Sequence, residues 1–154
     1  ARRTTMEIKE TQEQQTIVVR TTTSLEEIPA TLGSIYGELM EYLQRNGLTI
    51  TGYPFVLYHN ADMAALDIEA GFPVGTVVSG EGRVQPGSIP GGKVLSAIHI
   101  GPYATLEKTY TPVMEHIEKE GLQVTEWMYE LYLNSPEEVS EDQLQTEICF
   151  PLKA

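Results

Sequence analysis

Apolar side chains recur at intervals of three or four residues in two segments of the chain, the spacing that places them on one face of a helix. The first stripe extends over residues 32–43 and is followed by Gly47, and the second extends over residues 106–117 and is followed by Gly121. Glycine after such a stripe is a typical helix C-terminus, because it readily adopts the left-handed conformation that closes the last turn. We therefore predict one helix in each segment.

The two helical segments are related by a constant offset along the chain. Residues 31–51 and 105–125 are identical at eight of 21 positions, and the register continues beyond the helices. Chance similarity between two amphipathic helices would not continue into the segments that follow them. An internal duplication is therefore the better interpretation.

Segments with strand character surround each predicted helix in the same order. One segment precedes the helix and two follow it, and the last carries the signature Glu-x-x-Phe-Pro in both copies. The predicted strands are residues 15–23, 53–60 and 66–74 in the first copy and residues 93–100, 127–134 and 145–152 in the second. We expect a single α+β domain over residues 1–154, built from two βαββ units (about 13–74 and 92–152) with pseudo-twofold symmetry. Its antiparallel sheets should carry helices on one side and a ligand cleft on the other.

Alternation along the strands divides their side chains between two faces. The aromatic and aliphatic face of residues 53–57 and 127–133, which includes Trp127, is expected to pack on the helices. The opposite face combines carboxylates with tyrosines, which is unusual for a core and for a solvated surface. We interpret it as the lining of the cleft, and its members are Glu130, Glu147, Glu69, Tyr58, Tyr132 and Met128.

The charge balance excludes several classes of function. The chain has 22 acidic residues against ten Lys and Arg, giving a net charge of −12, so direct binding of this segment to nucleic acid is not expected. No apolar run approaches the roughly 20 residues that span a bilayer, and we expect a cytoplasmic protein without membrane association. Cys149 is the only cysteine and the three histidines are dispersed, which argues against a metal site. No nucleotide-binding or serine-hydrolase motif occurs, so no cofactor is expected.

Three motifs in order, residues 99–103 (HIGPY), 129–132 (YELY) and 146–152 (TEICFPL), resemble the GyrI-like small-molecule-binding superfamily. That superfamily includes effector domains of multidrug-responsive activators and of AraC-type regulators, the DNA gyrase inhibitor, and proteins similar to cyclopropanoid hydrolases. The resemblance extends from about Glu13 to Leu152. It implies that Glu130 lies centrally in an aromatic pocket, that Glu147 is a neighbouring acidic group, and that Trp127 occupies a position of pocket or core aromatics.

Each candidate also has a structural interpretation. Glu130 could be an exposed carboxylate or pair with a lysine such as Lys93, and Glu147 and Glu69 could accept hydrogen bonds that serve only the fold. Tyr110 is expected in the helix core, with its hydroxyl reaching the rim of the cleft. A lone histidine such as His99 is more often structural than catalytic.

Three functional classes remain open. The first is a module that binds amphipathic, cationic organic molecules beside Glu130 as a sensor or by sequestration. The second is a hydrolase of strained electrophiles in which Glu130 activates water and Tyr132 or Tyr58 donates a hydrogen bond. The third is a protein-interaction module such as a gyrase modulator. Because the chain begins at Ala1, we also expect a linked or partner DNA-binding domain in the regulatory case; the oligomeric state stays open.

Overall fold

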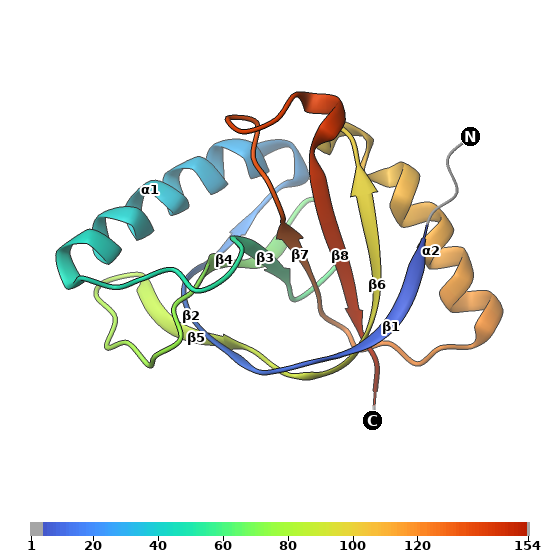
Figure 1. The fold of residues 1–154 in the computed structure, drawn as a ribbon, viewed down its shortest axis with the longest axis horizontal. Coiled ribbons are helices and arrows are strands. Elements are labelled where there is room, and N and C mark those ends of the chain that lie inside the picture. The colour runs from blue at the N-terminus through green and yellow to red at the C-terminus, as the bar shows by residue number, and fades with distance from the viewer. Residues whose placement is uncertain (1–4, 154) are drawn as a thin grey trace. The chain divides into compact units, whose positions relative to one another are not determined.

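The computed structural model describes residues 5–153, which form two compact units. The N-terminal unit, residues 12–91, contains β2 (Gln14–Thr23), α1 (Ile28–Asn46), β3 (Phe55–Tyr58), β4 (Leu66–Pro73) and β5 (Val84–Ile89). The C-terminal unit, residues 5–11 and 92–153, contains β1 (Met6–Thr11), β6 (Gly92–Ile100), α2 (Glu107–Glu120), β7 (Met128–Tyr132) and β8 (Gln145–Pro151). Figure 1 labels these elements.

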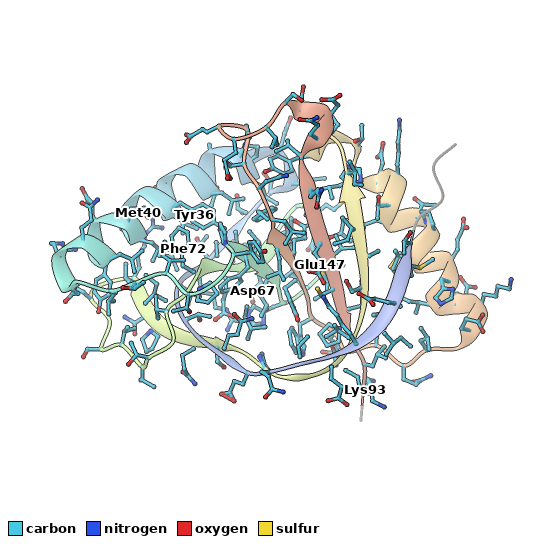
Figure 2. All side chains as sticks on the ribbon, in the orientation of Figure 1. Tyr36, Met40, Asp67, Phe72, Lys93 and Glu147 are labelled. Atoms are coloured by element: carbon cyan, nitrogen blue, oxygen red, sulfur yellow. The ribbon has the colours of Figure 1, made fainter. Side chains whose placement is uncertain are left out.

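The N-terminal unit is an antiparallel sheet in the order β3-β4-β2-β5, with α1 packed against it. The apolar stripe of α1 buries Ile35, Leu39 and Leu43, and the helix ends at Gly47 with φ +62°, as the sequence predicts. The ring of Tyr36 contacts that of Phe72 with centroids 5.2 Å apart, which shows the side of β4 that faces the helix (Figure 2).

The C-terminal unit is an antiparallel sheet in the order β1-β6-β8-β7, so β8 lies between β6 and β7 (Figure 1). Its core forms where α2 covers one face of this sheet. Met128 of β7 and Tyr110 of α2 pack at the margin of this core. The buried apolar side chains that form the core come from the helix, β6 and β8, and they are Leu95, Ala97, Val113, Ile117, Ile148 and Phe150.

The predicted helices and the six predicted strands are all present, and each strand end lies within two residues of its predicted position. Helix α1 begins four residues before its predicted apolar stripe. The order strand, helix, strand, strand occurs in each unit, whereas the twofold relation between the units stays a prediction. β1 was not predicted from the sequence, and β5 is the one strand that forms in the glycine-rich segment of residues 75–92. The predicted domain limits at residues 1 and 154 lie outside the described residues.

The predicted faces of β7 are wrong. Glu130 and Met128 lie on the same side as α2, because Glu130 accepts a hydrogen bond from Tyr110 and Met128 packs in the α2 core. Tyr132 shares that face by alternation. Trp127, Tyr129 and Leu131, which we expected to pack on the helix, point to the opposite face; Tyr129 is the cross-strand partner of Cys149.

The same inversion occurs in β3. Val56 and Tyr58 are cross-strand partners of Ala70 and Ile68, which share the α1-facing side of β4 with Phe72. Both faces of β3 are buried, since Phe55, Val56 and Leu57 are each at most 3% exposed. Hydrophobicity alone therefore could not decide which face meets the helix.

Within residues 5–153, no helix combines the length with the apolar composition that a membrane-spanning segment needs.

Candidate functional site

A buried carboxylate surrounded by tyrosines lies on the α2 side of the C-terminal sheet. Glu130 is only 4% exposed, so it is not the exposed carboxylate that the sequence left as an alternative. Tyr110 of α2 donates a hydrogen bond to Glu130 Oε2, and Tyr132 donates one to Oε1 at 2.8 Å. We call Glu130, Tyr110, Tyr132 and the adjacent Tyr103 the tyrosine–glutamate cluster.

Tyr103 forms the outer part of this cluster. It belongs to the 3-10 turn at Tyr103–Thr105, between β6 and α2, and its ring meets that of Tyr132 edge-on at 5.8 Å. Burial and the negative charge of Glu130 raise the pKa of the Tyr103 hydroxyl, so Glu130 acts electrostatically on this ring as well. Tyr103 remains 40% exposed and connects the cluster with the surface.

His99 fixes the turn that carries Tyr103. Its ring is buried and lies 3.0 Å from the Pro102 carbonyl through Nε2 and 2.7 Å from the Thr109 hydroxyl through Nδ1. A carbonyl can only accept, so Nε2–H donates to Pro102, and Nδ1 accepts from Thr109 in the neutral ring. This arrangement agrees with the structural role that we expected for a lone histidine.

An open depression along α2 borders the cluster. It has a volume of about 410 Å³ and is lined by Tyr110, Thr111, Met114, Glu115, Ile117 and Glu118. Met114 is half exposed there, although it belongs to the apolar stripe of the helix. An aromatic or aliphatic group could therefore lie against Tyr110, whose hydroxyl bonds Glu130, next to two further carboxylates.

Glu147, predicted to share a face with Glu130, lies on the opposite face of the same sheet (Figure 2 labels it on β8). Ile148 is the cross-strand partner of Glu130, and Glu147 is one residue away, so its side chain points the other way. Glu147 Oε2 accepts from Ser96 Oγ at 2.6 Å and lies 2.5 Å from Lys9 Nζ. Glu130 and Glu147 therefore do not form one acidic site.

The Glu147 face also carries a buried thiol and a pair of stacked aromatic rings. Burial and the negative charge of Glu147 raise the pKa of the Cys149 thiol. Burial and, to a smaller extent, electrostatic repulsion from Cys149 raise the pKa of the Tyr129 hydroxyl. Trp127 stacks on Tyr129 with ring centroids 6.0 Å apart. Trp127 is thus brought to the Glu147 face and not to the tyrosine–glutamate cluster.

The remaining candidates lie in the N-terminal unit. Glu69 Oε2 lies 3.0 Å from His59 Nε2, where it can accept a hydrogen bond from the ring. Glu69 is on the face of β4 opposite α1, as strand alternation predicts. On the same face Arg20 forms a two-point contact with Asp67 at 3.0 and 2.8 Å. Tyr58 is partly buried on the α1 side. Within residues 5–153 no group of three His, Cys, Asp or Glu side chains is arranged to hold a metal ion.

Sequence reasoning missed Lys9, Ser96 and Tyr103 as site residues. The alternation of Met6 and Ile8 is a weak signal for β1, and it was too short to place Lys9 opposite a carboxylate. Tyr103 was quoted within the HIGPY motif, but nothing in the linear pattern relates it to Tyr132, 29 positions later.

The fold and the three motifs agree with a comparison against protein-family models. The model of the GyrI-like small molecule binding domain matches residues 4–153, nearly the whole chain. The chain belongs to the GyrI-like family. The structural resemblance inferred from the motifs is therefore confirmed at the level of the family.

Solved structures of EcmrR are similar to this GyrI-like domain. A cryo-EM structure of an EcmrR–DNA complex is 26% identical with a TM-score of 0.87; the match covers 97% of this chain and 57% of EcmrR. The chain therefore spans little more than half the length of that relative. The crystal structure of the EcmrR C-terminal domain is 25% identical with a TM-score of 0.80, and the match covers 97% and 98% of the two chains.

More distant structures share the fold alone. A hydrolase from Listeria innocua is 16% identical with a TM-score of 0.68, covering 96% of this chain and 91% of that protein. SAV2435, solved with tetraphenylphosphonium, is 12% identical with a TM-score of 0.74, covering 97% and 94%. A comparison with curated protein sequences gives no match.

Proposed function

We propose that this GyrI-like domain binds an amphipathic organic cation at the tyrosine–glutamate cluster. The observation that carries the proposal is the position of Glu130, a 4% exposed carboxylate whose two oxygens each accept a phenol hydrogen bond. The fixed carboxylate supplies charge, and the surrounding rings supply apolar contact area.

The physical basis of the proposal is the low dielectric around Glu130. A negative charge that is removed from water interacts more strongly with an approaching cation than an exposed charge does. The phenol hydrogen bonds hold the carboxylate in place, so the carboxylate group itself is already oriented before a ligand arrives. Tyrosine faces add cation–π attraction, and a ligand anion would be repelled.

Access would run through the exposed part of the cluster. Tyr103 is 40% exposed, and the depression along α2 reaches Tyr110. Because Glu130 itself is almost fully buried, a ligand must displace a tyrosine ring before it contacts the carboxylate. Movement of Tyr103 and Tyr132 relative to each other would provide that opening.

A sensor role fits the comparison with EcmrR, a protein solved in complex with DNA whose C-terminal domain has this fold. In that role, ligand binding would alter a linked or partner DNA-binding domain. Sequestration of the ligand requires only the site itself.

Two ions of equal size and opposite charge test the proposal. Tetraphenylphosphonium is chosen as the cation because SAV2435, which shares the fold, is solved with it. Calorimetric titration in sodium buffer should show binding of tetraphenylphosphonium at least about tenfold tighter than that of tetraphenylborate. Equal affinities would mean that apolar area, and not Glu130, selects the ligand.

Hydrolysis of a strained electrophile is a second candidate, favoured by the contact of two phenol hydroxyls with Glu130. Glu130 would take a proton from water while the water oxygen bonds to a carbon of a cyclopropane ring that is conjugated to a carbonyl. The breaking ring bond gives its electron pair to the conjugated system, whose oxygen accepts a hydrogen bond from Tyr132. The proton that Glu130 removed from water is then passed to this product, which restores the carboxylate. Mass spectrometry would detect the gain of one water, which Glu130→Gln should abolish.

A further inference from the structure

The face of the C-terminal sheet opposite α2 carries a second carboxylate with a different set of neighbours. Glu147 is 6% exposed, and its Oε2 atom receives both the Ser96 hydroxyl at 2.6 Å and the Lys9 ammonium at 2.5 Å. Three strands contribute to this contact, since Lys9 is in β1, Ser96 in β6 and Glu147 in β8. Tyrosine hydroxyls bond Glu130, whereas an aliphatic hydroxyl and an ammonium bond Glu147.

The distances at Glu147 select the type of cation. Contacts of 2.5 and 2.6 Å require donors that carry hydrogen on nitrogen or oxygen. A quaternary nitrogen carries no N–H, and its methyl carbons approach an oxygen only to roughly 3.3–3.6 Å. A primary ammonium therefore fits the position beside Ser96, and a quaternary ammonium does not.

The ammonium at this position is the chain's own. Burial works to lower the pKa of Lys9, but the hydrogen bond and the charge of Glu147 outweigh it, so the pKa is raised and Lys9 stays charged. Lys9 belongs to β1, a strand at the edge of the sheet, and its side chain remains 38% exposed, so solvent reaches part of this lysine.

We propose that Glu147 and Ser96 form a second cation site, selective for primary alkylammonium groups, which Lys9 of β1 occupies in the ligand-free protein. A ligand with such a group competes with Lys9 and thereby weakens the attachment of β1 to β6. The two carboxylates of the unit then select different cations, bulky aromatic ones at Glu130 and small N–H donors at Glu147. This site does not depend on ligand binding at Glu130.

Chemical complementation tests the site directly. Lys9→Ala removes the atoms equivalent to n-propylammonium, so n-propylammonium should bind the variant and raise its melting temperature saturably, by about 3–6 °C at ten times the dissociation constant. Tetramethylammonium and n-propanol, at the same concentration and ionic strength, should produce no saturable rise. Wild-type protein should respond less than the variant, because Lys9 occupies the site.

Two double variants assign the effect to one carboxylate. Lys9→Ala/Glu147→Gln should lose the response to n-propylammonium, and Lys9→Ala/Glu130→Gln should retain it. An equal response of both double variants, or an equal response to tetramethylammonium, would overturn the proposal. Failure of tetraphenylphosphonium to bind the wild type would affect only the proposed function at Glu130.

Hydrogen exchange on the wild type provides a measurement that does not depend on the folding of a variant. Because a tethered group has an effective concentration in the millimolar range, hundreds of millimolar n-propylammonium are needed to displace Lys9. Exchange of the β1 amides, residues 6–11, should then become several-fold faster than in tetramethylammonium at equal ionic strength. Identical β1 exchange in the two salts would contradict competition with Lys9.

Discussion

Glu130 and Glu147 lie in neighbouring strands of one sheet but point to opposite faces, because the cross-strand partner of Glu130 is Ile148. The first carboxylate meets the hydroxyls of Tyr110 and Tyr132 beside α2, and the second meets Lys9 and Ser96 on the other face. A single acidic cleft that uses both residues is therefore not formed within this unit. Each carboxylate has its own chemistry, and each can be tested separately.

Removing a phenol donor from Glu130 should destabilise the fold. Hydrogen bonds to charged groups contribute roughly 1.5–3 kcal/mol, so Tyr110→Phe and Tyr132→Phe should each lower the free energy of unfolding by about 1–3 kcal/mol. Tyr53→Phe is the matched control, because Tyr53 is 51% exposed, and it should change stability by less than about 0.5 kcal/mol. Urea denaturation measures all three; a Tyr110→Phe variant as stable as the control would argue against a structural hydrogen bond to Glu130.

Two buried threonines provide a matched comparison of hydroxyl groups. Thr109 Oγ1 bonds His99 at 2.7 Å, whereas Thr146 Oγ1 has no hydrogen-bond partner among the residues that the structure describes. Thr109→Val should therefore lower the free energy of unfolding by roughly 1–3 kcal/mol, while Thr146→Val should be neutral or stabilising. The reverse order of the two variants in urea denaturation would show that the hydroxyl of Thr146 is bonded in solution.

The single thiol should be unreactive at neutral and mildly alkaline pH. Burial and the charge of Glu147 raise the pKa of Cys149, so the thiolate is scarce in the folded protein well above pH 8.5, where a free cysteine is half ionised. Because Cys149 is the only cysteine, labelling with a maleimide reports on it alone. Labelling of the native protein should be far slower than that of the urea-unfolded chain at both pH 7 and pH 9, and rates that match would contradict the burial of this thiol.

Alkaline pH should lower the free energy of unfolding through Lys9 and Cys149, which lie on the Glu147 face of the C-terminal sheet. Because the folded pKa of Lys9 is raised, its contribution is fully present below the unfolded value of about 10.4 and is lost as the pH rises through the folded pKa. The raised pKa of Cys149 acts in the same direction, with loss beginning near its unfolded value of about 8.5. In Lys9→Gln the decline in melting temperature above pH 10 should be shallower than in the wild type, and parallel curves would remove Lys9 from the explanation.

Local patterns were sufficient to predict most of the fold. The stripe over residues 32–43 and the left-handed position of Gly47 are set by neighbours a few residues apart, and α1 ends where they predict. Strand alternation likewise separated Glu147 from Ile148 correctly. It could not show which face of β7 meets α2, because Tyr129 and Glu130 are 2% and 4% exposed, so both faces are buried. That choice depends on the register with β8, a long-range property.

The candidate site was predicted in part for the same reason. Glu130, Tyr110 and Tyr132 were all candidates, and the structure brings these three together. Tyr103 and Lys9 were missed, because each reaches its partner through tertiary contacts that a linear pattern does not encode. Glu147 was expected beside Glu130 and lies on the other face. Trp127, which alternation assigned to the helix-facing side and the family resemblance to pocket or core aromatics, stacks on Tyr129 on the Glu147 face.

A calorimetric comparison of the wild type with Glu130→Gln shows whether Glu130 is the contact that selects organic cations. The affinity for tetraphenylphosphonium should fall at least about tenfold in Glu130→Gln, which corresponds to about 1.4 kcal/mol, because the variant keeps the size of the side chain and removes its charge. Glu69→Gln, which changes a carboxylate bonded to His59 in the other unit, should bind like the wild type. Equal affinity of the wild type and Glu130→Gln for tetraphenylphosphonium would show that Glu130 does not select the cation.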